Sequence, residues 1–180
     1  MSFIIQSLYF ALPIYLANMA PVLVKKIPWL NAPIDGGKFW RSKPVLGKNK
    51  TWRGFVAAII FACFTIWIQR LLFLNVEAVR SISLLNYGDS TIVLYGFFLG
   101  MGAIVGDLVK SFFKRRFSRP AGSLWFPFDQ IDFMLGAMIF SFWLDGVGYK
   151  VWLLLLLITP FLHWLINVVA YKLRLKNVPW

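Results

Sequence analysis

Residues 91–109 read TIVLYGFFLGMGAIVGDLV, a run that is apolar except for Thr91 and the aspartate near its end, Asp107. A predominantly apolar run of about 20 residues is long enough to cross the hydrocarbon core of a bilayer as a helix. Over the whole chain 59% of the residues are apolar and 14% are charged, whereas soluble proteins carry about a quarter charged residues. The composition therefore excludes a soluble domain and predicts an integral membrane protein. Close helix packing is predicted for this run by its small-xxx-small glycine pairs, Gly96, Gly100, Gly102 and Gly106.

Four further runs have the same character as this one. Together they predict an all-α membrane protein of one domain, residues 1–180, with five transmembrane helices at residues 2–24, 54–74, 91–109, 131–147 and 151–171. A β-barrel is excluded because the runs lack the alternating pattern of its strands. The first run is expected to remain as a helix, because no basic segment precedes it as in a signal peptide. The single cysteine excludes an internal disulfide.

The 19 Lys and Arg residues, which give a net charge of +12, are unevenly divided among the connecting segments. Residues 25–53 hold eight of them, residues 110–130 hold five, and the tail after Tyr171 holds three. The positive-inside rule therefore predicts an N-terminus outside the cell, a cytoplasmic C-terminus and two long basic cytoplasmic loops, 25–53 and 110–130. Topology signals and attraction to anionic lipid explain such charges as well as a binding site does.

Asp107 is expected in the last turn of the third span, where lipid and the helix dipole both disfavour an anion. Lys110, Ser111 and Lys114 follow on the same helical face. Two interpretations stay open. Asp107 is either a functional intramembrane carboxylate or the partner of Lys110 or Lys114 in a local ion pair that closes the bundle.

Asp129 and Asp132 open the fourth span three residues apart, which places them on one face of a helix. A helix N-terminus favours carboxylates, and that alone accounts for them. Two carboxylates so close to each other and to Asp107 repel, however, unless a divalent cation joins them. A Mg²⁺ ion shared with nucleotide phosphates resolves this repulsion, so we predict a metal site formed by Asp107, Asp129 and Asp132.

The first basic segment contains DGGK at residues 35–38 and GKNKTWRG at residues 47–54. Glycine permits a close approach of the backbone, and the lysines and arginine offer donors to a polyphosphate. The segment is not a Walker A loop, because Asn49 follows Lys48 where Ser or Thr is required. Solvated topology charges are the alternative.

Four motifs carry a resemblance to a known family: PIDGGK at residues 33–38, GKNKTWRG at 47–54, GD at 106–107 with SFFKRR at 111–116, and DQIDF at 129–133. In their order and spacing they resemble the CDP-archaeol synthase family, which is similar to the bacterial CDP-diacylglycerol synthases. The resemblance implies a membrane cytidylyltransferase that joins CTP to a lipid phosphate such as 2,3-di-O-geranylgeranylglyceryl 1-phosphate, with Mg²⁺, and releases pyrophosphate. It implies catalytic roles for Asp107, Asp129, Asp132 and Lys114, and nucleotide or phosphate contacts from Asp35, Lys48, Lys50, Thr51, Arg53, Ser111, Arg115 and Arg116.

Other functions remain open on the sequence alone. CDP-diacylglycerol synthesis from phosphatidic acid is one, because the aromatic tract at Trp125 and Phe126 could shape an entrance for fatty acyl chains. A small transporter or membrane scaffold is another, although transporters place polar groups at the midplane whereas these acids crowd one membrane face. The expected partners are CTP, a lipid phosphate and the bilayer, with no nucleic acid. The expected location is the plasma membrane, with the site facing the cytoplasm.

Overall fold

The computed structural model of the protein describes residues 3–120, 123–144, 146–172 and 174. These residues form helices α1 (Phe3–Leu23), α2 (Trp52–Asn75), α3 (Glu77–Ile82), α4 (Ile92–Arg116), α5 (Phe128–Ser141) and α6 (Tyr149–Lys172), and a hairpin of strands β1 (Phe39–Trp40) and β2 (Lys43–Pro44). Among the described residues, four helices, α1, α2, α4 and α6, are long and apolar enough to cross a membrane. The chain is thus a mostly helical, multi-pass membrane protein.

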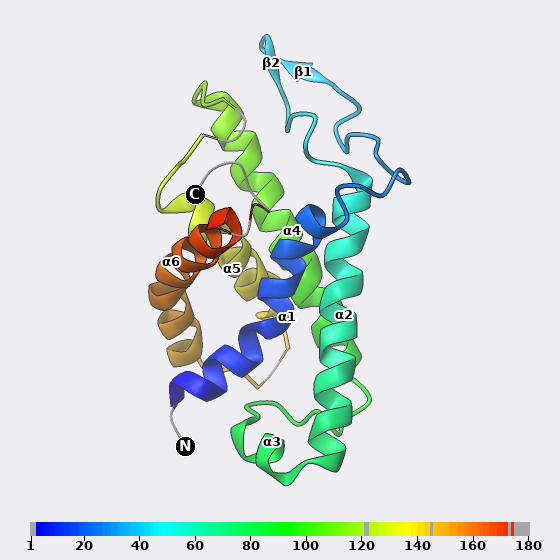
Figure 1. Cartoon of the computed structure of the whole chain (residues 1–180), viewed down its shortest axis with the longest axis vertical. Coiled ribbons are helices and arrows are strands. Elements are labelled where there is room, and N and C mark those ends of the chain that lie inside the picture. The colour runs from blue at the N-terminus through cyan, green and yellow to red at the C-terminus, as the bar shows by residue number, and fades with distance from the viewer. Residues whose placement is uncertain (1–2, 121–122, 145, 173, 175–180) are drawn as a thin grey trace.

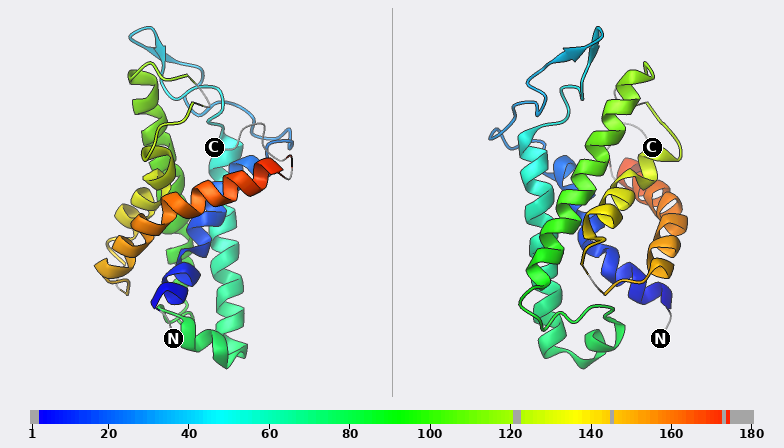
Figure 2. Two further views of the ribbon diagram at one scale, coloured as in Figure 1. Left: turned by 60° about the vertical axis from the view of Figure 1, so that its left-hand side comes forward. Right: turned by 180° about the vertical axis from the view of Figure 1, so that it is seen from behind.

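Two long connections, residues 24–51 and 117–127, lie at one end of the helical bundle (Figure 1). The hairpin β1–β2 stands above that end, and the short helix α3 lies at the other. Helix α4 is central and packs against α1, α2 and α5, while α6 crosses obliquely against α5 and α1 (Figure 2). The two basic segments predicted from the sequence therefore meet on one face of the molecule.

Three features of the fold differ from the sequence expectation. Helix α4 continues beyond residue 109 to Arg116, so the first part of the predicted second loop is helical. Helix α5 is 14 residues long, which at 1.5 Å per residue spans about 21 Å, less than the hydrocarbon core of about 30 Å. The hairpin adds a small β element to a fold predicted as all-α, with its turn at Arg41 and Ser42 in the left-handed region.

Helix α4 presents glycines to two neighbours. A Cβ atom at Gly96 would lie 2.9 Å from the Cα of Cys63, and one at Gly100 would lie 2.8 Å from the Cβ of Ala62, so this face fits tightly against α2. Gly102 and Gly106 instead meet the backbone of α5 around Gly136. The close packing predicted from the small-residue pairs is confirmed.

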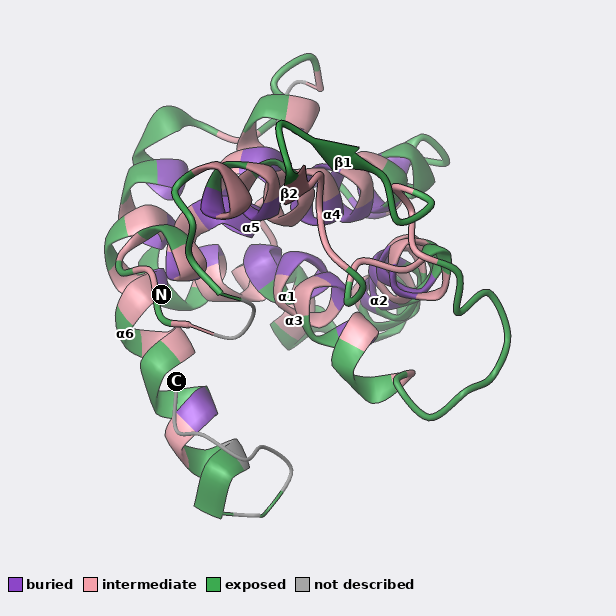
Figure 3. Cartoon of the chain, turned by 90° about the horizontal axis from the view of Figure 1, so that it is seen from above, coloured by how far each residue is buried: buried purple, intermediate pink, exposed green. Residues whose placement is uncertain are grey.

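Most buried residues lie on the sides of the helices that face the centre of the bundle, as the purple ribbon segments in Figure 3 show. Phe10 of α1, Leu99 of α4 and Phe133 of α5 have no exposed surface. Apolar side chains also cover the outward faces, among them Phe64 of α2 and Leu157 of α6. A helix that is apolar on all sides suits a lipid environment, because its exposed face then meets hydrocarbon rather than water.

The α4–α5 contact predicts the effect of enlarging Gly136. In Gly136→Ala the new Cβ would fall against the backbone of Gly102 and Gly106, which cannot rotate away. We expect a destabilisation of about 1–3 kcal/mol, as for other overpacked cores, measured as a lower melting temperature in detergent. The control is Gly148→Ala, where nothing lies within 4 Å of the added Cβ. Equal melting of the two variants would contradict the tight crossing.

Candidate active site

A cavity of about 790 Å³ opens at the end of the bundle where the two connections meet. Its polar wall comes from the first connection and from the loop-facing ends of α4 and α5, and includes Lys48, Lys50, Asp107, Lys110 and Asp129. Its walls within the bundle are formed mainly by side chains of α1 and α4, namely Asn18, Pro21, Val22, Ala103 and Ile104. One cavity thus joins a strongly charged surface to an apolar one.

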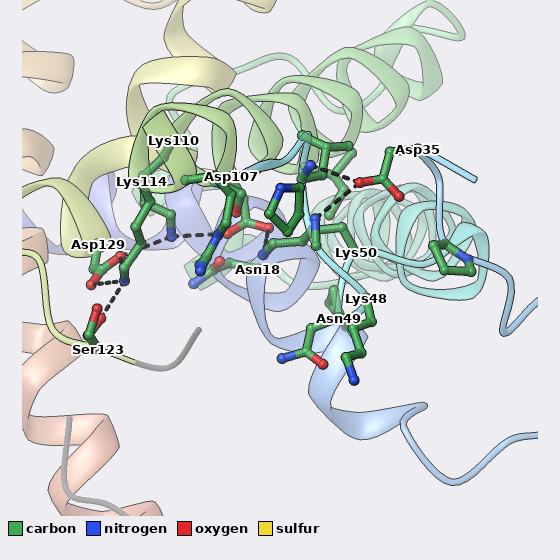
Figure 4. Close-up of a pocket in the computed structure, with 18 of the residues that line it drawn as sticks. Asn18, Asp35, Lys48, Asn49, Lys50, Asp107, Lys110, Lys114, Ser123 and Asp129 are labelled. Atoms are coloured by element: carbon green, nitrogen blue, oxygen red, sulfur yellow. Dashed lines mark hydrogen bonds and ion pairs between the residues drawn. The ribbon is translucent and has the colours of Figure 1, made fainter. Parts of the chain in front are cut away.

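Lys110 lies at the centre of the charged wall. Its Nζ atom is 3.0 Å from Asp107 Oδ1, 3.3 Å from Asp129 Oδ1 and 2.9 Å from Asp132 Oδ2. Figure 4 shows Lys110 and Lys50 approaching Asp107 from opposite sides. The three carboxylates predicted as metal ligands are therefore brought together around one ammonium group.

Two further lysines complete the cluster. Lys50 Nζ donates to Asp107 Oδ2 at 2.5 Å. Lys114 Nζ lies 2.9 Å from both carboxylate oxygens of Asp129 and also donates to the carbonyl of Ser123. The cluster holds as many ammonium groups as carboxylates, so its charges balance, which stabilises sheltered ions. The predicted ion pair of Asp107 with Lys110 is confirmed, whereas Lys114 pairs with Asp129 instead.

The donor chemistry of this cluster fits a magnesium ion bound together with phosphates. Mg²⁺ usually takes one or two carboxylates and completes its shell with water and phosphate oxygens. The side chain of Asp132 is 5% exposed, and its Oδ1 atom has no hydrogen-bond partner among the described residues. In the described ranges no three Asp, Glu, His or Cys side chains form a metal site by themselves. Carboxylates plus a nucleotide phosphate are therefore the combination that the residues support.

The start of α5 places its two carboxylates. The helix begins at Phe128, directly after Pro127, so Asp129 lies in its first turn and Asp132 one turn later. The backbone N–H of Trp125 donates to Asp129 Oδ2 at 2.6 Å. Asp129 thereby links the segment between α4 and α5 to the lysines of α4.

Backbone pairing fixes the first connection where Lys50 emerges. The N–H of Ile34 donates to the carbonyl of Lys50 at 2.8 Å, and the N–H of Trp52 donates to the carbonyl of Ala32 at 3.1 Å. Gly47 turns the chain with a φ of +98°, a region that glycine enters without strain. Lys50 is therefore directed at Asp107 from a backbone that is held on both sides.

Asp35 stabilises the first connection by hydrogen bonds to its backbone. Its carboxylate accepts hydrogen bonds from the backbone N–H groups of Gly37, Leu46 and Gly47 at 2.9, 2.8 and 3.1 Å. Partial burial raises the pKa of Asp35, but these backbone donors outweigh it and hold the pKa below its ordinary value. Asp35 is thus saturated with backbone donors, and a positioning role fits it better than the predicted phosphate contact.

Arg116 fastens the hairpin to the end of α4. Its guanidinium donates to the carbonyls of Trp40, Lys43 and Pro44 at 2.6, 3.2 and 2.5 Å. It also lies 5.2 Å from the ring centroid of Trp40 and 5.1 Å from that of Phe112. In return Lys43 Nζ donates to the carbonyl of Arg116 at 2.9 Å. The hairpin of the first connection is thereby joined to the end of α4, where the second connection begins.

The comparisons with known proteins agree with this arrangement. The sequence profile of the CarS-like CDP-archaeol synthase family matches residues 1–180. The chain belongs to the CDP-archaeol synthase family. The CDP-archaeol synthase of Pyrococcus abyssi is 37% identical over 98% of each chain, and that of Thermococcus gammatolerans is 38% identical over 97% of this chain and 95% of the relative. A solved intramembrane enzyme for archaeal membrane lipid biosynthesis is 25% identical with a TM-score of 0.71, over 89% of this chain and 92% of that one.

Most of the residues that the family resemblance predicted for the site line the cavity: Asp35, Lys48, Lys50, Asp107, Ser111, Lys114, Arg115 and Asp129. Asp132 reaches the cluster through Lys110. Three others have different surroundings. Thr51 caps α2 by accepting from the N–H of Gly54, Arg53 donates to the carbonyl of Ile27, and Arg116 holds the hairpin. For these three, positioning of the loops fits the contacts better than binding of phosphate.

Sequence reasoning missed three residues of the cavity. Lys110 was recognised only as a partner of Asp107, because its contacts with Asp129 and Asp132 depend on how α5 packs against α4. Asn18 of α1 gave no signal. His163 of α6 also lines the cavity, and its ring nitrogen lies 3.0 Å from the amide of Asn167.

The contacts of Arg116 predict how the hairpin responds to Arg116→Lys. A lysine cannot bridge three carbonyls or stack its head on two rings, so we expect faster trypsin cleavage within residues 25–51 in detergent. The matched control is Arg41→Lys. The guanidinium of Arg41 lies 5.5 Å from the Trp40 ring centroid, and in the described part of the chain it has no hydrogen bond. Equal digestion of the two variants would contradict the fastening role of Arg116.

Proposed function

We propose that this protein transfers the cytidylyl group of CTP to a membrane lipid phosphate, which gives a CDP-lipid and pyrophosphate. The observation that supports this most directly is the cavity that joins the lysine-rich wall to the apolar wall of a membrane bundle. The charged wall suits the phosphates of a nucleoside triphosphate. The apolar wall suits the glycerol group of a lipid and the first part of its chains. Membership in the CDP-archaeol synthase family supports the same activity.

The reaction needs charge stabilisation and alignment rather than a covalent enzyme intermediate. An oxygen of the lipid phosphate forms a bond to the α-phosphorus of CTP, while the bond from that phosphorus to the bridging oxygen breaks and pyrophosphate leaves with the electron pair. In phosphoryl transfer of this kind, catalysis is mostly positioning and electrostatic stabilisation. Lys48, Lys50 and Arg115 line the cavity, and we assign to them the neutralisation of the phosphates.

The proposed reaction uses Mg²⁺ as its cofactor. We propose that Asp107, Asp129 and Asp132 hold it, since they are the carboxylates that converge on one point of the cavity wall. When bound with a nucleotide, the ion neutralises charge on the phosphate oxygens. Lys114 keeps Asp129 in place through both carboxylate oxygens, and Ser111 offers a hydroxyl from the same face of α4.

We infer a topology of five crossings, with the site on the cytoplasmic side of the plasma membrane. Helix α5 is short, but the connections before and after it lie toward opposite ends of the bundle (Figure 1). The start of α1 and the end of α6 also lie at opposite ends, as an odd number of crossings requires. The basic connections gather at the end that carries the cavity, which the positive-inside rule assigns to the cytoplasm.

An archaeal-type isoprenoid ether phosphate is the lipid that we propose, because the relatives are CDP-archaeol synthases. Phosphatidic acid is the second candidate. The exposed aromatic side chain of Phe126 stands beside the cavity end of α5, and apolar grooves discriminate weakly between chains, since one methylene is worth only about 1–3 kcal/mol. The ether phosphate is expected to be preferred with some tolerance for other lipids.

Purified protein tests the activity directly. With CTP, Mg²⁺ and the geranylgeranyl ether phosphate we expect release of pyrophosphate, and slower release with phosphatidic acid. Asp132→Asn should lower turnover at least about tenfold, because it removes one converging carboxylate whose only ion pair in the described structure is with Lys110. The control Glu77→Gln changes an exposed acid of α3, remote from the cavity. No turnover of CTP with either lipid would refute the proposal, and faster turnover of phosphatidic acid would reassign the lipid.

Cysteine labelling tests the sidedness. In a Cys63→Ala background, Ser42→Cys lies in the exposed turn of the hairpin and Ser90→Cys lies exposed near α3, at the other end of the bundle. Impermeant reagents added to intact cells should label the cysteine at position 90 and spare that at position 42 until the membrane is opened. The reverse pattern would place the cavity outside, away from cytoplasmic CTP.

A further inference from the structure

The point on which the three carboxylates converge is held by a side chain of the protein itself. Lys110 Nζ lies within 3.3 Å of an oxygen from each of Asp107, Asp129 and Asp132. The lysine side chain is 14% exposed, so solvent screens these ion pairs less than pairs on an open surface. A positive charge among converging carboxylates is the arrangement that a bound divalent cation also produces.

We propose that Lys110 is an exchangeable internal cation. Its ammonium holds the three carboxylates together in the absence of metal, and it moves from them to the nucleotide phosphates when a divalent cation and the nucleotide bind together. The inference rests on the proposed function for the identity of the nucleotide. It adds a device by which the protein takes up metal and nucleotide jointly rather than separately.

The charge balance supports this exchange. Three carboxylates face the ammonium groups of Lys50, Lys110 and Lys114, so a divalent cation entering alone would leave excess positive charge in a sheltered place, which is unfavourable. A triphosphate entering with it supplies anionic oxygens that the displaced ammonium can contact. Metal alone should therefore bind weakly, and nucleotide should strengthen its binding. By linkage the metal must strengthen nucleotide binding by the same factor.

The contacts single out Lys110 among the three lysines. In the described structure Lys50 pairs only with Asp107, and Lys114 pairs only with Asp129 and is also tied to the carbonyl of Ser123. Lys110 alone in that part of the chain contacts all three carboxylates. Its flexible four-carbon stem lets the ammonium change partners while the helix stays in place, and Lys110 lines the cavity into which it would turn.

Titration of purified protein with Mg²⁺ alone, followed by thermal melting in detergent, tests the exchange. In Lys110→Met the carboxylates lose their shared partner, so the metal-free variant should melt below the wild-type protein. Mg²⁺ should then raise its melting temperature with a midpoint at least about fivefold lower than in the wild type, the small end of typical coupling between ligands. Added CTP should lower the Mg²⁺ midpoint of the wild type, and this effect should shrink in the variant.

Lys48→Met is the matched control. Lys48 lines the same cavity but forms no ion pair with the three carboxylates, so its loss tests the effect of charge alone. A Mg²⁺ midpoint in Lys110→Met that is unchanged, raised, or lowered no further than in Lys48→Met would overturn the inference. If the Met variant does not fold, Lys110→Gln replaces it. Its amide can still donate to a carboxylate, which supports folding, and because the amide is neutral the same expectations apply.

The titration separates this inference from the proposed function. Since it needs no lipid and no turnover, a lower Mg²⁺ midpoint in the variant supports the exchange even if cytidylyl transfer is not observed. Conversely, a wild-type protein that makes CDP-lipid while Lys110→Met binds Mg²⁺ as the wild type does would overturn the exchange and leave the proposed function intact. Lys110→Arg retains the positive charge, and its Mg²⁺ midpoint should stay near that of the wild type.

Discussion

Gly102, Gly106 and Gly136 let the backbones of α4 and α5 touch, and this contact determines where the charged groups of the cavity lie. Side chains larger than hydrogen would separate the helices, and the carboxylates of α5 would then move away from the lysines of α4. Small residues at helix crossings serve this purpose widely in membranes, where close packing replaces the hydrophobic effect as a source of attraction. In this protein the same crossing that holds the bundle together also assembles the site.

Electrostatic pairing extends that assembly from the helices to the loops. Asp107 accepts a hydrogen bond from Lys50 of the first connection, and Asp129 accepts one from the backbone N–H of Trp125 in the second. Because these carboxylates are partly sheltered from water, losing either contact would weaken the cluster, although Lys110 and Lys114 would still pair with them. The charge cluster therefore includes contacts from both connections, and Arg116 adds a second attachment at the hairpin.

The sequence predicted what depends on composition and local pattern: the long apolar helices, the two basic connections on one face and the carboxylates that meet in the cavity. It missed what depends on packing. The hairpin is held to α4 by Arg116, which donates to three of its carbonyls, a contact between segments more than 70 residues apart. Hydropathy did not predict the length of α5. Residues 142–147 are apolar at most positions, and yet the helix ends before them, at Ser141. Thr51, Arg53 and Arg116 have side chains typical of phosphate ligands, and only the structure shows them occupied with the backbone.

The length of α4 changes the physical explanation for Asp107. An end of the helix at residue 109 would place this carboxylate at the negative pole of the dipole, but the helix continues to Arg116, and the dipole acts mainly within the last turn. The basic residues Lys114, Arg115 and Arg116 occupy that last turn instead, where the dipole favours them. The cost of Asp107 is therefore one of desolvation inside the bundle, which Lys50 and Lys110 offset by direct contact. A carboxylate that needs two lysines from different segments contributes little to stability that an apolar residue would not supply, and its place at the cavity wall points to a role in binding charge.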